Sequence, residues 1–217
     1  VYDGTAFNKY EGNTVKYDVY SKAEKKFFCE QLIDTPTYTS LWTKAVKTQI
    51  LKNDPNDYSK YYGKNMGEDW LRSIHIFSAT NSIVCVNTPL YNYRTNLSSI
   101  SKSFSVDKIN KFNMLHVYEQ FMKYLPLWNM NDSEYISRLN KRWLDETIYT
   151  FVQFYEGAAD NNTRKQIVDF DWSLFLPEGF SVNCLGETNS NSVLLYNKIM
   201  DKTMVCIDFL KAGCHDS

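Results

Sequence analysis

Residues 66–77 read MGEDWLRSIHIF, and this stretch decides which folds the sequence can adopt. Apolar side chains recur at helical spacing from position 70 onwards, which predicts a helix that begins at Glu68. Acidic residues suit the first turn of a helix, because the free N–H groups and the helix dipole favour negative charge there. A carboxylate at this place can also accept a proton from a hydroxyl group within about 3 Å. Glu68 and Asp69 therefore have two interpretations, an ordinary helix start and a catalytic pair.

The residues before and after this helix alternate between strand-like and helix-like patterns. Residues 16–20 (KYDVY) and 82–87 (SIVCVN) are rich in β-branched and aromatic side chains, which predicts two strands, the second of them buried. Residues 21–34 start with Ser21 and carry a glutamate three positions later, the spacing of a capping box, and predict a short helix. Residues 39–52 place apolar side chains on one side of an amphipathic helix.

The second half of the chain has the periodicity of helices. Apolar residues recur every three or four positions from residue 104 to residue 125, and a second long helix is predicted to open at Asp132. A short helix over residues 160–168 and a last helix over residues 192–211 follow.

These patterns predict an α/β fold in two parts. Residues 1–103 would form a partial sheet with helices, and residues 104–217 would form a mainly α-helical region. A length of 217 residues and a hydrophobic content of 43% suit a folded globular protein. The 16 tyrosines, 13 phenylalanines and 5 tryptophans can fill a core, and they can also form flat platforms for sugars or bases.

Charge and cysteine content exclude several classes of function. The formal charge of −1 gives no overall field that would attract nucleic acid, so we expect no nucleic-acid partner. Five cysteines without a CxxC pair, and three scattered histidines, argue against a disulfide framework and a zinc site. Reduced thiols and the lack of a long apolar run predict a cytoplasmic protein. Peripheral association with the inner face of a membrane and homo-oligomerisation both stay open.

Two further stretches carry candidate site residues. LWTK at residues 41–44 offers Trp42 and Lys44, which are either a packing tryptophan with a solvated lysine or part of a binding site. LYNYRTNLSSIS at residues 90–101 ends an extended segment with Arg94 and continues into a loop that contains Ser99. A guanidinium group can form a fork onto phosphate oxygens, and it can equally form a surface salt bridge.

The order of LWTK, GED with its helix, an apolar strand and PLYNYRTNLSSIS resembles the second half of family 2 glycosyltransferases. The resemblance covers roughly residues 38–103. These are inverting enzymes of the GT-A fold that build bacterial surface polysaccharides from nucleotide sugars and saccharide acceptors.

The resemblance implies a role for each candidate residue. Asp69 would be the catalytic base that deprotonates the acceptor hydroxyl, and Glu68 would neighbour the acceptor pocket. Arg94 and Ser99 would belong to the loop that closes over the donor diphosphate, where they would offset charge on the leaving group. Trp42 and Lys44 would lie beside the acceptor, and Trp70 would be a sugar platform.

The sequence departs from the family in its first half. The family's nucleotide-binding strand and its D-x-D motif, which holds Mg²⁺ or Mn²⁺, have no counterpart here, and DPND at residues 54–57 and DFDW at residues 169–172 lack the context of that motif. We therefore predict no cofactor in this chain, and we expect the isolated chain to be inactive. The alternative is a non-catalytic module in which the helices serve interaction or oligomerisation.

Overall fold

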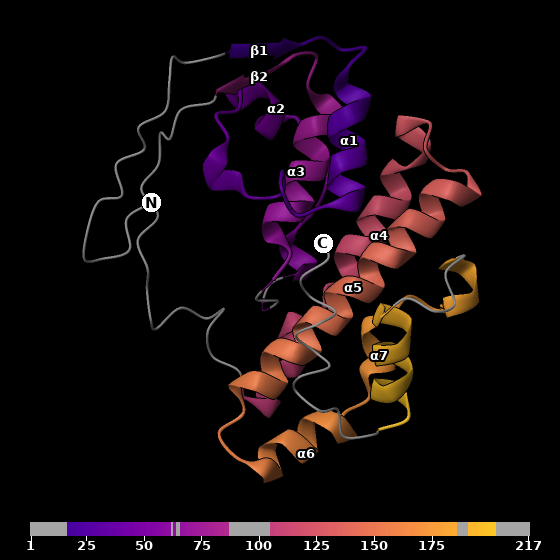
Figure 1. Ribbon diagram of the computed structural model, residues 1–217. Coiled ribbons are helices and arrows are strands. Elements are labelled where there is room, and N and C mark those ends of the chain that lie inside the picture. Colours follow the sequence, from indigo (N-terminus) through magenta and orange to yellow (C-terminus); the bar gives the residue numbers. More distant parts are fainter. Residues whose placement is uncertain (1–16, 62, 64–65, 87–104, 186–190, 203–217) are drawn as a thin grey trace.

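The computed structural model describes residues 17–61, 63, 66–86, 105–185 and 191–202. Its longest helix, α5 (Ser133–Gly157), crosses the molecule and separates two groups of elements (Figure 1). At one end lie the strands β1 and β2 with helices α1, α2 and α3, and at the other end lie α6 and α7. The described chain is mainly helical, with one small antiparallel sheet of two strands, which agrees in part with the predicted α/β fold: the second part is mainly α-helical as expected.

The helices with the clearest sequence signals form where they are predicted. Helix α3 (Glu68–Ala79) begins directly after Gly67. Helix α5 begins after Asp132, whose carboxylate accepts hydrogen bonds from the backbone N–H groups of the second and third helical residues. Helix α6 (Asn161–Asp169) begins in the same way after Asp160. The prediction of these three helices is confirmed.

Three predicted helices are shorter or more broken than expected. Residues 39–52 form the 3₁₀ turn η1 (Leu41–Thr43) and the short helix α2 (Thr48–Lys52), with extended backbone at Lys44 between them. The predicted helix from residue 104 is the 3₁₀ helix η4 (Val106–Phe112) followed by α4 (Leu115–Tyr124). Helix α7 runs over Asn191–Met200, and residues 203–211 of the predicted last helix lie outside the described residues.

The remaining elements are short. Helix α1 (Lys25–Asp34) follows Ser21, whose backbone N–H donates to the Glu24 carboxylate at 2.8 Å, as the capping-box spacing predicts. The other 3₁₀ helices are η2 (Ser59–Tyr61), η5 (Pro126–Trp128), η6 (Trp172–Phe175) and η7 (Val182–Leu185).

The sheet consists of β1 (Tyr17–Tyr20) and β2 (Ile83–Val86), which pair antiparallel. Both strands were predicted, but the prediction that the second is buried is wrong. Val84 is 55% exposed and Val86 is 41% exposed, and Val19, which pairs with Val84, is 68% exposed. Among the described residues, one face of the ribbon packs on the helices, through Tyr20, Ile83 and Cys85.

The buried side chains form two cores on either side of the middle of α5. The upper core joins α1 and α3 to α4 and the first half of α5; its largest members are Phe28, Trp70, Phe77, Phe121, Trp128 and Trp143. The lower core joins the second half of α5 to η4, α6, η6 and α7; its largest members are Phe112, Phe151, Phe154, Tyr155, Trp172 and Phe175. The two cores thus meet within α5, and the predicted boundary between residues 103 and 104 lies outside the described residues.

Gly67 determines how closely α3 approaches α4. Its φ angle of 99° lies in the left-handed region, where a Cβ atom is unfavourable. A Cβ atom at this position would also lie 2.6 Å from Cγ2 of Val117 and 3.1 Å from Nε2 of His116. Glycine is therefore required here both by backbone conformation and by space.

Candidate functional site

The structure brings together two of the motifs that the sequence separates. The side chain of Asp69, in the first turn of α3, accepts a hydrogen bond at Oδ2 from the backbone N–H of Leu41, at 3.2 Å and across 28 positions of sequence. Leu41 opens the turn η1 and is the first residue of LWTK. Within the described part of the chain, Oδ1 of Asp69 accepts no hydrogen bond, so one oxygen of this half-buried carboxylate is available to a ligand.

Lys44, at the end of LWTK, lies near the same carboxylate. Its Nζ donates to the backbone oxygen of Ser40 at 2.6 Å and lies 5.6 Å from the centre of the Phe77 ring. Burial lowers the pKa of Lys44 to about 8, and the negative charge of Asp69 opposes that shift. The lysine is therefore half-buried and titrates close to physiological pH, unlike the solvated lysine of the simpler interpretation.

The other predicted residues around Asp69 fall into different environments. Trp42 is 48% exposed and Glu68 is exposed, so both can meet a ligand. Trp70 is 8% exposed, and its ring makes edge contacts with Phe121 and Trp143 in the upper core. The structure assigns Trp70 to core packing, because its ring has no open face on which a sugar could stack. Arg94 and Ser99 lie outside the described residues.

A second carboxylate near α3, Asp54, is held by a dense polar network. Its Oδ1 accepts hydrogen bonds from the backbone and the side chain of Asn56, and its Oδ2 accepts one from the Tyr58 hydroxyl at 2.7 Å. Arg72 on α3 donates to Oδ2 at 3.3 Å, and Nδ1 of His75 lies 3.7 Å from Oδ1. Burial would raise the pKa of Asp54, but the hydrogen bonds from Tyr58 and Asn56 and the nearby His75 outweigh it and hold the pKa below its usual value.

The same network reaches α4 and fixes the loop that precedes α3. Asn56 donates to the Tyr124 hydroxyl at 2.9 Å and accepts from the side chain of Gln120 at 2.7 Å. His75 contacts the Tyr124 hydroxyl at 3.3 Å and the backbone oxygen of Ile50 at 3.0 Å. The network ties residues 50–58 to two helices, so its role is to hold the loop in place.

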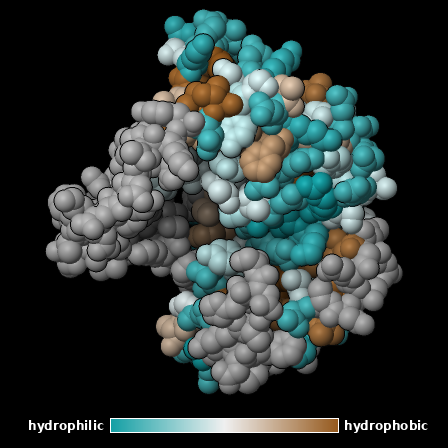
Figure 2. Space-filling view, turned by 45° about the horizontal axis from the view of Figure 1, so that its top comes forward, coloured by the Kyte–Doolittle hydropathy of each residue, from teal (hydrophilic) through white to brown (hydrophobic). Residues whose placement is uncertain are grey.

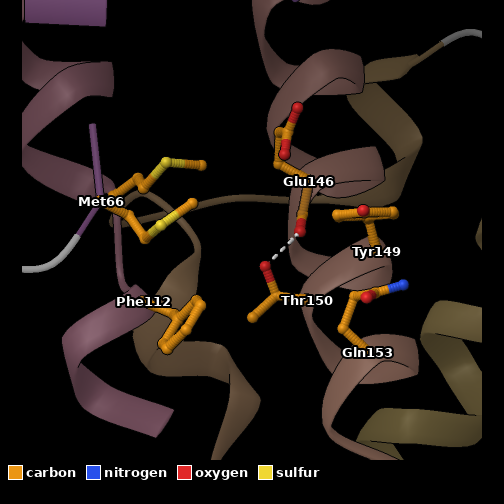
Figure 3. Close-up of a pocket in the computed structure, with 7 residues that line it drawn as sticks. Met66, Phe112, Glu146, Tyr149, Thr150 and Gln153 are labelled. Carbon is orange, nitrogen blue, oxygen red and sulfur yellow. Dashed lines mark hydrogen bonds between the residues drawn. The ribbon is translucent and has the colours of Figure 1, made fainter. Parts of the chain in front are cut away.

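A cavity of about 110 Å³ lies beside α5, close to the start of α3 (Figure 3). One wall is apolar and the other is polar; the lining residues are Met66, Phe112, Met114, Glu146, Tyr149, Thr150 and Gln153. Glu146 forms an ion pair with Arg142, one turn earlier on α5, and the guanidinium group of Arg142 lies 5.3 Å from the centre of the Trp70 ring.

Glu146 is a site candidate that the sequence reasoning missed. Burial raises the pKa of Glu146, against the opposing charge of Arg142. The available signal was its position three residues after Trp143 and four before Thr150, which places a carboxylate beside the buried stripe of a helix.

The described residues do not form a divalent metal site. No three His, Cys, Asp or Glu side chains come together in the part of the chain that the structure describes. The Asp54 carboxylate of DPND is already engaged by Tyr58, Asn56 and Arg72, and the Asp171 carboxylate of DFDW caps η6. The described aspartates of DPND and DFDW therefore do not fit the Mg²⁺ or Mn²⁺ that the resemblance implies.

Comparison with known proteins supplies no family. No family model, no curated protein and no solved structure matches the chain. None of the described helices combines the length and the apolar character that a membrane span requires.

Proposed function

We propose that this chain is the acceptor-side part of an inverting glycosyltransferase, with Asp69 as the general base. The observation that supports this proposal most strongly is the contact between Asp69 and the first residue of LWTK. Two motifs that were singled out from sequence alone meet at a half-buried carboxylate with one oxygen open. The proposal includes two further elements that the resemblance implies, a GT-A-like sheet and a nucleotide-sugar donor.

The chemistry requires few groups from this chain. The Asp69 carboxylate takes the proton of an acceptor hydroxyl as that oxygen attacks the anomeric carbon of the donor sugar. The bond from the anomeric carbon to the diphosphate breaks on the opposite face, and its electron pair leaves with the nucleoside diphosphate. A single displacement of this kind inverts the anomeric configuration.

The neighbours of Asp69 would assist this step without forming covalent bonds to the substrates. The hydrogen bond from Leu41 holds one carboxylate oxygen, which leaves the other to face the hydroxyl. Below about pH 8, Lys44 carries a positive charge near the carboxylate. Trp42, which follows Leu41 in the chain, is half exposed and would contribute aromatic surface to a sugar ring, and the exposed Glu68 would contribute a second hydrogen-bond acceptor.

The stereochemistry of transfer tests this proposal. The protein that carries this chain would be incubated with a panel of α-linked nucleotide sugars and saccharide acceptors, and the new linkage would be assigned by proton NMR. We expect a β-linked product from an α-linked donor. A product with retained configuration, or hydrolysis and transfer that both stay at background across the panel, would contradict the proposal.

One observation favours the alternative, a non-catalytic interaction module. The outer face of the β1–β2 ribbon presents Val19, Val84 and Val86, and hydrophobic residues on the face shown in Figure 2 gather in patches. If interaction is the function, Val19→Thr together with Val84→Thr should reduce self-association measured by sedimentation, with no change in helix content. A chain that is monomeric at every concentration tested would exclude homo-oligomerisation.

A further inference from the structure

We propose that the cavity beside α5 is a binding site for the edge of a saccharide ring, with Glu146 as its main hydrogen-bond acceptor. The ligand class rests on the proposed function, because a glycosyltransferase must hold an acceptor sugar. The site itself rests on the cavity, its two unlike walls and the Arg142–Glu146 ion pair.

The walls of the cavity match the two kinds of surface that a sugar ring presents. Met66, Phe112 and Met114 form an apolar wall, which suits the C–H groups of a ring. Glu146 and Gln153 project from α5 on the other side, with Tyr149 beside them (Figure 3). A carboxylate accepts hydroxyl hydrogens and an amide both donates and accepts. The two residues are seven positions apart on α5, about 10 Å along the helix, so they would bind different parts of a saccharide.

The size of the cavity limits what can enter it. A volume of about 110 Å³ is smaller than the roughly 150 Å³ of a cavity that encloses a benzene molecule. A whole hexose does not fit inside, but a ring edge with one or two hydroxyl groups does. Tyr149 is 55% exposed, so the cavity has a rim at the surface where the rest of a saccharide can remain in solvent.

The ion pair has hydrogen-bonding capacity left for a ligand. The side chains of Arg142 and Glu146 are 13% and 17% exposed, so both charges are largely withdrawn from water. Such a pair is weak support for stability, because desolvation offsets most of the attraction. A carboxylate has about four lone-pair positions, of which one guanidinium contact uses a part. Within the described chain, the buried Nε of Arg142 has no hydrogen-bond partner.

One residue of the cavity wall is also close in sequence to Asp69, the proposed base. Met66, on the apolar wall, is three residues before Asp69, and Gly67 between them packs against α4. The ring of Trp70, next to Asp69, lies under the guanidinium group that pairs with Glu146. The start of α3 thus carries the Asp69 carboxylate and follows directly after a residue of the cavity wall.

Methionine methyl groups provide a direct readout of this site. The chain would be labelled with ¹³C at the methionine ε-methyl groups and titrated with a panel of methyl glycosides. We expect the signals of Met66 and Met114 to shift with a common saturation curve, and the signal of Met122, which is 37% exposed on α4, to stay constant. Cyclohexanol, a ring with one hydroxyl group, would bind more weakly than the preferred glycoside.

Variants on α5 distinguish the loss of a hydrogen-bond acceptor in the cavity from a general effect of removing a negative charge. Glu146→Gln should weaken glycoside binding about tenfold, and Gln153→Met about threefold, because each loses hydrogen bonds worth roughly 0.5–1.5 kcal/mol. Glu156→Gln removes the same charge from an exposed position of the same helix and should bind as the unchanged protein does. Gln153→Met keeps the volume and leaves the ion pair intact, so it still tests the site if Glu146→Gln folds poorly.

The outcomes distinguish this inference from the proposed function. Constant Met66 and Met114 signals with every glycoside, or equal affinity for cyclohexanol, would overturn the saccharide site and would leave the Asp69 chemistry untouched. Shifts that are insensitive to both Glu146→Gln and Gln153→Met would overturn the assignment of these residues. Binding at the methionines by a protein that never transfers sugar would support the site and contradict the proposed function.

Discussion

Asp54, in the loop before α3, and Asp69, in the first turn of α3, are both aspartates next to this helix, and their surroundings differ in how many of the carboxylate's hydrogen-bonding positions are occupied. The Asp54 side chain is 3% exposed and accepts hydrogen bonds from Asn56, Tyr58 and Arg72. Asp69 is half-buried and accepts one hydrogen bond, from Leu41, within the described residues. A carboxylate with all its positions engaged can hold a loop in place, but it has no position left for a substrate hydroxyl.

One helix, α3, contacts both carboxylates' surroundings. The middle of α3 anchors residues 50–58 through Arg72 and His75, while its first turn presents Asp69 beside LWTK. A rigid anchor close to a carboxylate with an open oxygen is the arrangement that a positioned base requires. Removal of each carboxylate should therefore have opposite consequences for stability and for chemistry.

The largest effect on stability should follow removal of Asp54. Asp54→Ala leaves the partly buried Tyr58 and Asn56 without their common acceptor and frees Arg72, which is 41% exposed, so we expect a loss of about 3 kcal/mol from the unsatisfied polar groups. Asp69→Ala should cost about 1 kcal/mol or less, since it removes one hydrogen bond and one favourable helix-dipole interaction. Urea unfolding of both variants measures the difference, and equal losses would show that the two carboxylates do not differ as described.

A smaller effect is expected when the start of α3 is changed. Gly67→Ala places a Cβ atom at a left-handed φ and in contact with Val117, which we expect to lower the free energy of unfolding by about 2–3 kcal/mol. Gly63→Ala is the matched control, because Gly63 also has a left-handed φ, of 85°, but no atom of the described residues lies within 4 Å of the added Cβ atom. It should cost about 1 kcal/mol, the backbone term alone.

The two glycine variants together isolate the packing of α3 on α4. If Gly67→Ala and Gly63→Ala lower the Tm of thermal unfolding by the same amount, the close approach to Val117 does not contribute to stability. The start of α3 would then be held by something other than this contact.

The smallest effect concerns Lys44, whose lowered pKa should appear as a dependence of stability on pH. Between about pH 8 and the ordinary lysine value of 10.5, the unfolded chain binds more protons at this position than the folded chain does. Stability should therefore rise with pH across that window, by about 1 kcal/mol after allowance for partial exposure. Below pH 8 both states are protonated and the contribution of Lys44 is constant.

Comparison with the Lys44→Met variant separates the contribution of Lys44 from that of the other groups that titrate in the same pH range. Lys44→Met should lose this rise, whereas Lys22→Met, at an exposed turn, should retain it. Urea unfolding from pH 7 to pH 10.5 gives the two curves. Parallel curves for the unchanged protein and Lys44→Met would mean that Lys44 is as solvated as an ordinary surface lysine.

The sequence predicts the parts of the fold that local signals control. Asp132 and Asp160 cap α5 and α6, and Gly67 precedes α3, because a capping oxygen or a residue tolerant of left-handed φ acts within a few positions. LWTK was predicted to be helical from its apolar spacing, and it is a turn. The backbone N–H of Leu41 donates to Asp69, and the backbone oxygen of Thr39, two residues before Leu41, accepts a hydrogen bond from Ser73. No local sequence pattern reveals these contacts.

The candidate site likewise has residues that the sequence identifies and arrangements that only the fold reveals. Asp69 and Lys44 were identified from motifs, but their proximity depends on how η1 folds against α3. Trp70 was assigned to a sugar because aromatic residues serve both cores and platforms, and only its burial distinguishes the two. The Asp54 network and the Glu146 cavity join residues from distant parts of the chain, so spacing along the sequence carries almost no signal for them.

The most direct test of the account is the effect of Asp69→Asn on the rate of sugar transfer by the protein that carries this chain. Loss of a general base should reduce kcat by about 10²–10⁴-fold. Glu134→Gln is the matched control, because Glu134 holds the same second position of α5 that Asp69 holds in α3. We predict that this control transfers sugar at the unchanged rate and that donor binding is the same in both variants. Transfer by Asp69→Asn within a few-fold of the control would show that Asp69 is only an acid at a helix start.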